Sequence, residues 1–156
     1  MSVMKIALGA DHAGYELKET IKQWLQQQGH TVADAGTTSA ESVDYPDFAL
    51  KVGEEVAEGL CERGILVCGS GIGMAMAANK VAGVRAANVC NAIEAQLSRE
   101  HNDANVLALG ARLIDPAAAL DIVKTWLDTP FSGGRHQRRV DKMAAIERLN
   151  GQTGGK

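Results

Sequence analysis

Residues 66–80 read LVCGSGIGMAMAANK, and this stretch decides the expected fold. Ile65–Val67 is a short apolar run typical of a buried strand. Three glycines follow within five positions, and Met74–Lys80 is rich in good helix formers. A strand, a glycine turn and a helix leave unpaired backbone N–H groups at the start of the helix, where an anion binds favourably. The stretch therefore predicts a strand–turn–helix unit that forms a cradle for a small anion.

Cys68 stands at the entrance of this turn, at the end of the expected strand. A parallel sheet places its ligands at the carboxyl ends of its strands, and a thiol beside a helix N-terminus loses its proton more readily. Cys68 is therefore a candidate base or nucleophile. The alternative, a cysteine that packs as a small hydrophobic residue, stays open at this point.

Two other phosphate-binding motifs do not fit the turn. The dinucleotide fingerprint needs a glycine where Met74 stands and an acidic residue in the region of Asn88 and Val89. The P-loop needs Gly-Lys followed by Ser or Thr, a triplet that the chain lacks. The remaining interpretation of the turn is a cradle for a small anion.

The rest of the chain alternates short apolar runs with amphipathic segments. Apolar runs predict strands, and apolar residues at helical spacing predict helices between them. This alternation predicts an α/β fold in which a five-stranded parallel sheet is covered by helices on both sides. The expected strands are Lys5–Leu8, His30–Ala33, Ile65–Val67, Val84–Val89 and Val106–Leu109, and the expected helices are Tyr15–Gln28, Phe48–Gly59, Met74–Lys80, Ala92–Glu100, Pro116–Leu127 and Arg135–Leu149.

The helical pattern also predicts which side chains face the core. Ile93 and Leu97 are expected to face inward, and Met74 and Met76 are expected to fill core space. Residues 1–150 are expected to form a single domain, followed by a flexible tail over residues 151–156.

The composition is that of an ordinary globular domain. The 156 residues are 46% hydrophobic and 22% charged, with a formal net charge of −3, which argues against nucleic acid or an anionic membrane as a partner. No apolar run reaches the roughly 20 residues of a membrane span, and the first residues lack the layout of a signal peptide. Three widely spaced cysteines argue against a disulfide framework or a zinc site and favour the reducing cytoplasm.

Polar residues follow three of the expected strands. Asp11–His12, Cys68–Gly73 and Arg112 each come directly after a strand, so a parallel sheet brings them to one edge. A carboxylate and an imidazole beside an anion cradle suit proton transfer and phosphate binding. A helix cap with a solvated neighbour is the alternative for Asp11 and His12. The pattern predicts one site built from several strand ends.

Three further residues have two interpretations each. His101 ends an expected helix, where its charge complements the helix dipole, or it serves as a general acid. We expect the second role, with His101 at the same edge of the sheet as Cys68. Asn102 is either a turn former or an amide that binds a hydroxyl group, and Tyr45 is either a packing residue or a ligand contact.

Arg135 and Arg139 lie four residues apart on one face of the last expected helix, so both guanidinium groups can reach one target. A solvated basic face that also includes Arg138 is the alternative. The preceding pair Gly133–Gly134 lets this segment leave the domain body. The segment could then deliver its arginines to a neighbouring subunit, which would make a dimer the active unit.

Taken together, these motifs resemble those of the type B ribose-5-phosphate isomerases, which are related to the allose-6-phosphate and galactose-6-phosphate isomerases. The resemblance covers nearly the whole chain and rests on residues 9–14, 68–73, 77–80, 101–108 and 133–140. It implies a three-layer α/β/α sandwich with a Rossmann-like sheet and a C-terminal helix, in a homodimer with active sites at the subunit interface. It also implies interconversion of ribose 5-phosphate and ribulose 5-phosphate with no metal or other cofactor.

The resemblance assigns roles to individual residues. Cys68 is similar to the base that moves the proton between C1 and C2 of the sugar. His101 is similar to the acid that assists opening of the furanose ring, with Asp11 nearby. The N–H groups that hold the enediolate are implied for the loop of Gly69, Ser70, Gly71, Ile72 and Gly73. Phosphate contacts, some of them from the partner subunit, are implied for His12, Arg135 and Arg139, and further substrate contacts for Asn102 and Arg112.

The family has two branches that differ in the base. One branch has a glutamate where this chain has Met74 and lacks a cysteine at the position of Cys68, so this chain resembles the cysteine branch. Ser70 replaces a threonine common in that branch and keeps its hydroxyl group, so we count it among the expected catalytic residues. Two alternatives remain: a hexose-6-phosphate isomerase of the same family, and a non-catalytic α/β module that senses phosphate.

Overall fold

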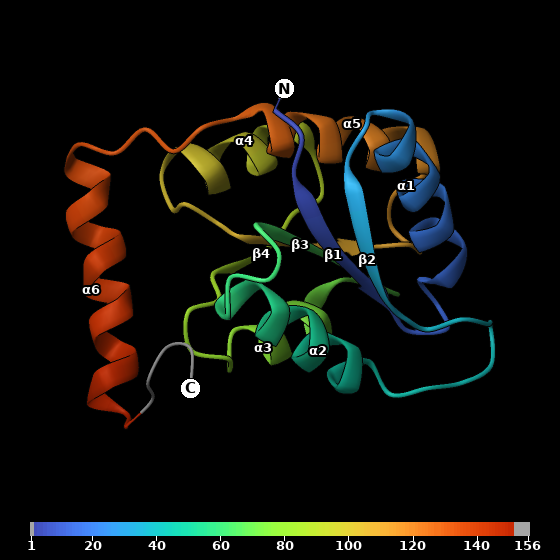
Figure 1. Ribbon diagram of the computed structural model, residues 1–156, viewed down its shortest axis with the longest axis horizontal. Helices are drawn as coiled ribbons and strands as arrows, with labels where there is room; N and C mark the ends of the chain where they lie inside the picture. Colours follow the sequence, from blue (N-terminus) through green and yellow to red (C-terminus); the bar gives the residue numbers. More distant parts are fainter. Residues whose placement is uncertain (1, 152–156) are drawn as a thin grey trace.

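The computed structural model describes residues 2–151, in which five strands form a single sheet (Figure 1). The strands pair in parallel in the order β2-β1-β3-β5-β4. The predicted five-stranded parallel sheet is confirmed, although β2 is longer and β4 shorter than the sequence pattern predicts. The strands are β1 (Lys5–Ala10), β2 (Thr31–Gly36), β3 (Arg63–Cys68), β4 (Ala86–Asn88) and β5 (Val106–Gly110).

The helices lie in two layers on the sheet. Helices α1, α4 and α5 bury side chains against one face and α2 and α3 against the other, whereas α6 stands at one side of the sandwich (Figure 1). The expected three-layer α/β/α sandwich with an additional C-terminal helix is therefore confirmed. The helices are α1 (Tyr15–Gln27), α2 (Tyr45–Ala57), α3 (Ile72–Ala78), α4 (Ala92–Glu100), α5 (Pro116–Asp128) and α6 (Arg135–Leu149).

The central strand β3 joins the two cores, because alternate side chains of a strand point to opposite faces. Ile65 and Val67 pack into the core beneath α1 and α5, whereas Leu66 and Cys68 pack into the core beneath α2 and α3. Burial of a large aliphatic side chain contributes about 1.5–3 kcal/mol to stability. The end of β3, and with it Cys68, is thus held firmly in the body of the domain.

The prediction for the inward face of α4 is wrong. Ile93 is 70% exposed and Leu97 is 42% exposed, while Ala95 and Arg99 are buried. The guanidinium of Arg99 is accommodated because it donates to the carbonyl groups of Thr129 and Ala104 and to a carboxylate. Periodicity locates an apolar stripe, but it does not say whether that stripe meets the core or another surface.

The two methionines of α3 differ in burial, although both were predicted to fill core space. Met74 is fully buried, as predicted, but Met76 is 66% exposed, so its predicted core role is wrong. The two residues lie two positions apart on a helix and therefore face different sides.

The C-terminal prediction is largely outside the described structure. Of the predicted tail over residues 151–156, only Gly151 is described. That residues 1–150 form a single domain remains a prediction. Within residues 2–151, every helix is too short or too polar to cross a membrane.

Candidate active site

The Cys68 sulfur lies at the mouth of the glycine turn. Its side chain is 5% exposed, and Sγ accepts a hydrogen bond of 3.1 Å from the backbone N–H of Gly71. Ser70 Oγ accepts a local hydrogen bond of 3.2 Å from the N–H of Ile72, the first residue of α3. The turn is possible because Gly71 adopts a φ of +81°, in the left-handed region that glycine tolerates.

Two carbonyl groups at the start of the turn are held by hydrogen bonds from the residues that follow the neighbouring strand β5. The carbonyl groups of Cys68 and Gly69 accept hydrogen bonds from the N–H groups of Ala111 and Arg112, just after β5. The N–H groups of Gly69 and Ser70 have no acceptor among the residues that the structure describes. The N–H of Gly73 likewise has no acceptor there, whereas the N–H groups of Gly71 and Ile72 bond within the turn itself.

Asp11 and His12 follow β1 and lie beside the end of β3. The N–H of Asp11 donates to the carbonyl of Val67 at 3.2 Å, and its buried carboxylate accepts from the N–H of Gly14 at 3.1 Å. His12 Nδ1 accepts a hydrogen bond of 3.2 Å from the N–H of Val43. In a neutral ring, the proton then resides on Nε2, which remains available as a donor.

Tyr45 and Arg112 complete this set. A Cβ atom at Gly73 would lie 2.6 Å from the Tyr45 ring, and one at Gly69 would lie 3.0 Å from an Arg112 guanidinium nitrogen. We call Asp11, His12, Tyr45, the turn of residues 68–73 and Arg112 the carboxyl-edge group. The predicted convergence of residues 11–12, 68–73 and 112 at one edge of the sheet is confirmed.

His101 lies at the opposite edge of the sheet, so its expected position beside Cys68 within one subunit is wrong. A helix that follows a parallel strand runs back along the sheet, so α4 ends near the amino end of β5. In the register of β3 and β5, Gly64 pairs with Val106 and Cys68 with Gly110. The two edges of the sheet, marked on β3 by Gly64 and Cys68, are therefore about 13 Å apart along the strand, at about 3.3 Å per residue.

The second set of predicted residues surrounds His101. Its ring stacks on that of His136, with centroids 4.4 Å apart and 13° between the planes. Desolvation and then the charges of His101 and the two nearby arginines lower the pKa of His136 below its ordinary value. We call His101, Asn102, Arg135, His136 and Arg139 the α4–α6 group.

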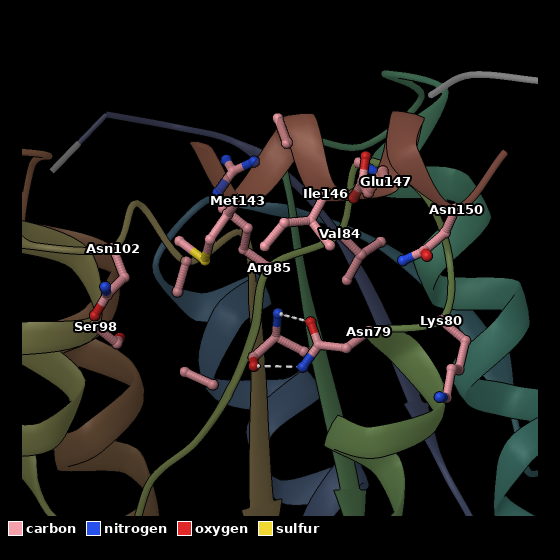
Figure 2. Close-up of a pocket in the computed structure, with 15 residues that line it drawn as sticks. Asn79, Lys80, Val84, Arg85, Ser98, Asn102, Met143, Ile146, Glu147 and Asn150 are labelled. Carbon is pink, nitrogen blue, oxygen red and sulfur yellow. Dashed lines mark hydrogen bonds between the residues drawn. The ribbon is translucent and has the colours of Figure 1, made fainter. Parts of the chain in front are cut away.

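A cavity adjoins this second group, and Cys68 is not among the residues that line it. It has a volume of about 540 Å³ and lies between α6 and the body of the domain, as Figure 2 shows. Asn102, Met143 and Ile146 are among its lining residues. Glu147 also lines the cavity, and its carboxylate accepts from the N–H of Gly83 at 2.9 Å.

Sequence reasoning gave no role to two residues that contact these groups. His136 stacks on His101, and its place in the first turn of α6 beside Arg135 was an available signal. Asn88 donates to the carbonyl of Ser70 at 3.3 Å, and no motif in the sequence marks it. Residues 2–151 contain no group of three or more His, Cys, Asp or Glu side chains placed to hold a metal ion.

Residues 6–143 match the model of a protein family described as Ribose/Galactose Isomerase. The chain belongs to this family. The predicted resemblance to the type B ribose-5-phosphate isomerases is therefore confirmed, and with it the α/β fold that the family shares.

Individual relatives match over almost the whole chain. A solved structure of Clostridium thermocellum ribose-5-phosphate isomerase B is 55% identical with a TM-score of 0.93, and the match covers 94% of this chain and 99% of that one. Ribose-5-phosphate isomerase B of Escherichia coli is 49% identical, over 92% of this chain and 96% of its own. The D-erythrulose-4-phosphate isomerase of Pectobacterium atrosepticum is 44% identical, over 93% and 96%.

Proposed function

We propose that this protein is an aldose–ketose isomerase that interconverts ribose 5-phosphate and ribulose 5-phosphate. The observation that carries the proposal is the Cys68 sulfur at the mouth of a turn that has unpaired N–H donors. Two of the relatives named above, at 55% and 49% identity, carry the name ribose-5-phosphate isomerase B. The reaction is redox-neutral and needs no cofactor. We place it in the cytoplasm, where the three cysteines, which are free, stay reduced.

Cys68 acts as the base that moves one proton. The thiolate removes the proton from C2 of the open-chain aldose and returns it to C1 from the same face, through a cis-enediolate. The hydroxyl proton passes from O2 to O1, so that the C1 carbonyl becomes a hydroxyl group and the C2 hydroxyl becomes a carbonyl. The N–H groups of Gly69 and Ser70 are available to stabilise the enediolate oxygens. Loss of one such donor costs on the order of 3 kcal/mol in other enzymes. The hydroxyl of Ser70 and the carboxylate of Asp11 orient the sugar oxygens beside the sulfur.

The α4–α6 group opens the ring and holds the phosphate. His101 transfers a proton to the ring oxygen, and Asn102 binds a sugar hydroxyl group. Arg135 and Arg139 bind the phosphate by charge-assisted hydrogen bonds, together with His12. The remaining substrate contacts are the ring of Tyr45, the guanidinium of Arg112 and the backbone of Gly71, Ile72 and Gly73.

We propose that the two groups meet across the interface of a homodimer, with the α4–α6 group supplied by the partner subunit. Within one subunit the two groups lie at opposite edges of the sheet. Ile72 and Met76 on α3 and Ile93 on α4 are exposed apolar side chains, which favours an interface with a second copy. The cavity under α6 offers a surface into which a second subunit can pack.

A panel of phosphorylated sugars tests the reaction. Purified protein is expected to interconvert ribose 5-phosphate and ribulose 5-phosphate more efficiently than it isomerises allose 6-phosphate, galactose 6-phosphate or erythrulose 4-phosphate. The erythrulose compound belongs in the panel because a relative at 44% identity is named for it. Preferred turnover of a hexose 6-phosphate would assign the chain to that alternative. Ligand binding without turnover of any sugar would assign it to the phosphate-sensing module.

A mixing experiment tests the shared site. Cys68→Ala and His101→Ala proteins are each expected to be inactive, but subunit exchange produces a mixed dimer that has one intact site. A 1:1 random mixture then recovers about a quarter of wild-type activity, since about half of the dimers are mixed and each has one of two sites intact. If both residues acted within one subunit, the mixture would stay inactive. A mixture of Cys68→Ala and Cys68→Ser proteins is the matched control.

A further inference from the structure

The peptide group that joins Ser70 to Gly71 is held at both of its ends. Its N–H, which belongs to Gly71, donates to the Cys68 sulfur at 3.1 Å. Its carbonyl, which belongs to Ser70, accepts from the side-chain Nδ2 of Asn88 at 3.3 Å. Because both bonds belong to one planar unit, the bond at the carbonyl also sets the direction of the N–H.

This peptide group needs an external anchor. A peptide group rotates when ψ of one residue and φ of the next change together, and glycine at the second position makes both orientations accessible. Gly71, with its φ of +81°, is such a residue. A rotated peptide would remove the N–H from the sulfur and turn the carbonyl oxygen towards it. The oxygen carries partial negative charge and would repel the electron-rich sulfur, whereas the N–H donates a hydrogen bond to it.

Asn88 reaches the turn from a strand that is not its neighbour. It ends β4, where it pairs with Ala108 of β5, so its side chain crosses the end of β5 to meet the turn after β3. Gly110 leaves the space for this arrangement. A Cβ atom there would lie 2.6 Å from the Ser70 carbonyl oxygen. The Nδ2 must face Ser70, because the other end of the amide is an acceptor and cannot bind a carbonyl.

We propose that Asn88 is a positioning residue that fixes the Ser70–Gly71 peptide, so that its N–H stays on the sulfur of the catalytic Cys68. The catalytic part of this inference rests on the proposed function, whereas the effect on the thiol does not. Asn88→Leu, which keeps the size but removes the donor, is expected to lower kcat about threefold to tenfold and leave KM nearly unchanged. A bond to the base matters for proton transfer and not for substrate binding.

The reactivity of the Cys68 thiol is measured directly as its rate of alkylation by iodoacetamide at pH 7. Cys90 is exposed and is replaced by serine in every protein tested. Cys61 contributes little, since burial and a hydrogen bond to Glu55 raise the pKa of its thiol to about 11. In this background, Asn88→Leu is expected to slow alkylation of Cys68 about threefold to tenfold, because a rotated peptide turns its carbonyl oxygen, and not its N–H, towards the reacting sulfur.

Two more variants keep the outcome decisive. Asn88→Asp preserves the shape, removes the donor and is expected to slow alkylation at least as much as Asn88→Leu. Asn91→Asp adds the same charge three residues away at the cap of α4, where aspartate also caps well, and is expected to alkylate at the wild-type rate. Wild-type rates in both Asn88 variants would overturn the proposal. Slower alkylation in a protein that isomerises no sugar would support the role of Asn88 and reject the isomerase function.

Discussion

The carboxyl-edge group and the α4–α6 group are built in contrasting ways. Around Cys68, the turn is tied to β5 and to Asn88 by hydrogen bonds, and the sulfur is almost fully buried. Arg135 and Arg139 are exposed, on a helix that stands at one side of the body (Figure 1). Gly133–Gly134, both at positive φ, connects that helix to the domain. The carboxyl-edge group is therefore held in place by the sheet of its own subunit, whereas the positions of Arg135 and Arg139 depend on the position of α6.

This contrast matches the demands of the two tasks that we propose. Proton transfer and enediolate stabilisation need donors fixed to within a fraction of an ångström, which a buried turn on a rigid sheet provides. A phosphate can be bound by long, charged side chains that adjust to it. A residue's place in the fold, and not only its chemical type, therefore indicates which task it can perform.

Replacement of the sulfur tests the rigid region most severely. Cys68→Ser is expected to reduce kcat by about a thousandfold or more, because a serine hydroxyl stays protonated at neutral pH and cannot take up the C–H proton, while substrate binding persists. Isomerase assays and calorimetric titration with ribose 5-phosphate measure the two effects. Substantial turnover in the purified variant would reject Cys68 as the base.

Gly71→Ala tests how tightly the turn is fitted. An added Cβ would lie 2.8 Å from Asn88 Nδ2 and 2.9 Å from the carbonyl carbon of Leu109, at a φ of +81°. We expect a loss of about 3 kcal/mol in the free energy of unfolding, measured by denaturant titration. Gly59→Ala is the matched control, because Gly59 has a φ of +78° with nothing within 4 Å. Gly59→Ala should lower the free energy of unfolding by only about 1 kcal/mol, the cost of a left-handed backbone at alanine. Equal losses in the two variants would contradict a tightly fitted turn at Gly71.

The arginines of α6 test the second region. Arg139→Ala is expected to raise KM about 10- to 100-fold with little change in kcat, because a phosphate contact is made throughout the reaction. Arg138→Ala, an adjacent exposed residue on the same helix, controls for the loss of one positive charge and should change KM little. A fall confined to kcat would argue against the phosphate role.

The smallest expected effect concerns the support of the rigid region, through the buried Lys18 of α1. Lys18 Nζ bonds both carboxylate oxygens of Asp34 on β2, at 2.8 and 2.9 Å. Burial opposes ionisation of Asp34, but hydrogen bonds from Lys18, the N–H of Gly36 and Lys22 outweigh it and lower the pKa of the carboxyl group. The folded state therefore favours the ionised form.

Asp34→Asn is expected to cost about 1 kcal/mol of stability at pH 7, a modest value because Asp34 is partly exposed. A carboxyl group with a lowered pKa stabilises the fold above its unfolded pKa, and this contribution is lost as the pH falls. The difference in Tm between wild type and variant should therefore shrink below about pH 4. Asp128→Asn, which breaks the surface pair with Lys124, is the control and should show no such difference. A difference that persists at low pH would contradict the assignment.

The sequence by itself was enough to predict the succession of strands and helices along the chain and the parallel type of the sheet. It also predicted the convergence of residues 11–12, 68–73 and 112 at one edge of the sheet. These features follow from local signals: apolar periodicity, glycine turns, and the rule that parallel strands end at one edge. Several motifs spread over nearly the whole chain, the turn of Cys68 among them, together indicated the family.

Which helix faces are buried, and which edge of the sheet holds each functional residue, became clear from the three-dimensional packing. Ile93, Leu97 and Met76 have the pattern of core residues, yet they are exposed, because a pattern does not identify the surface that covers it. His101 follows a helix and not a strand, so it lies at the amino edge of the sheet, away from Cys68. Asn88 contacts the turn by crossing another strand, and such a contact leaves no trace in the local sequence.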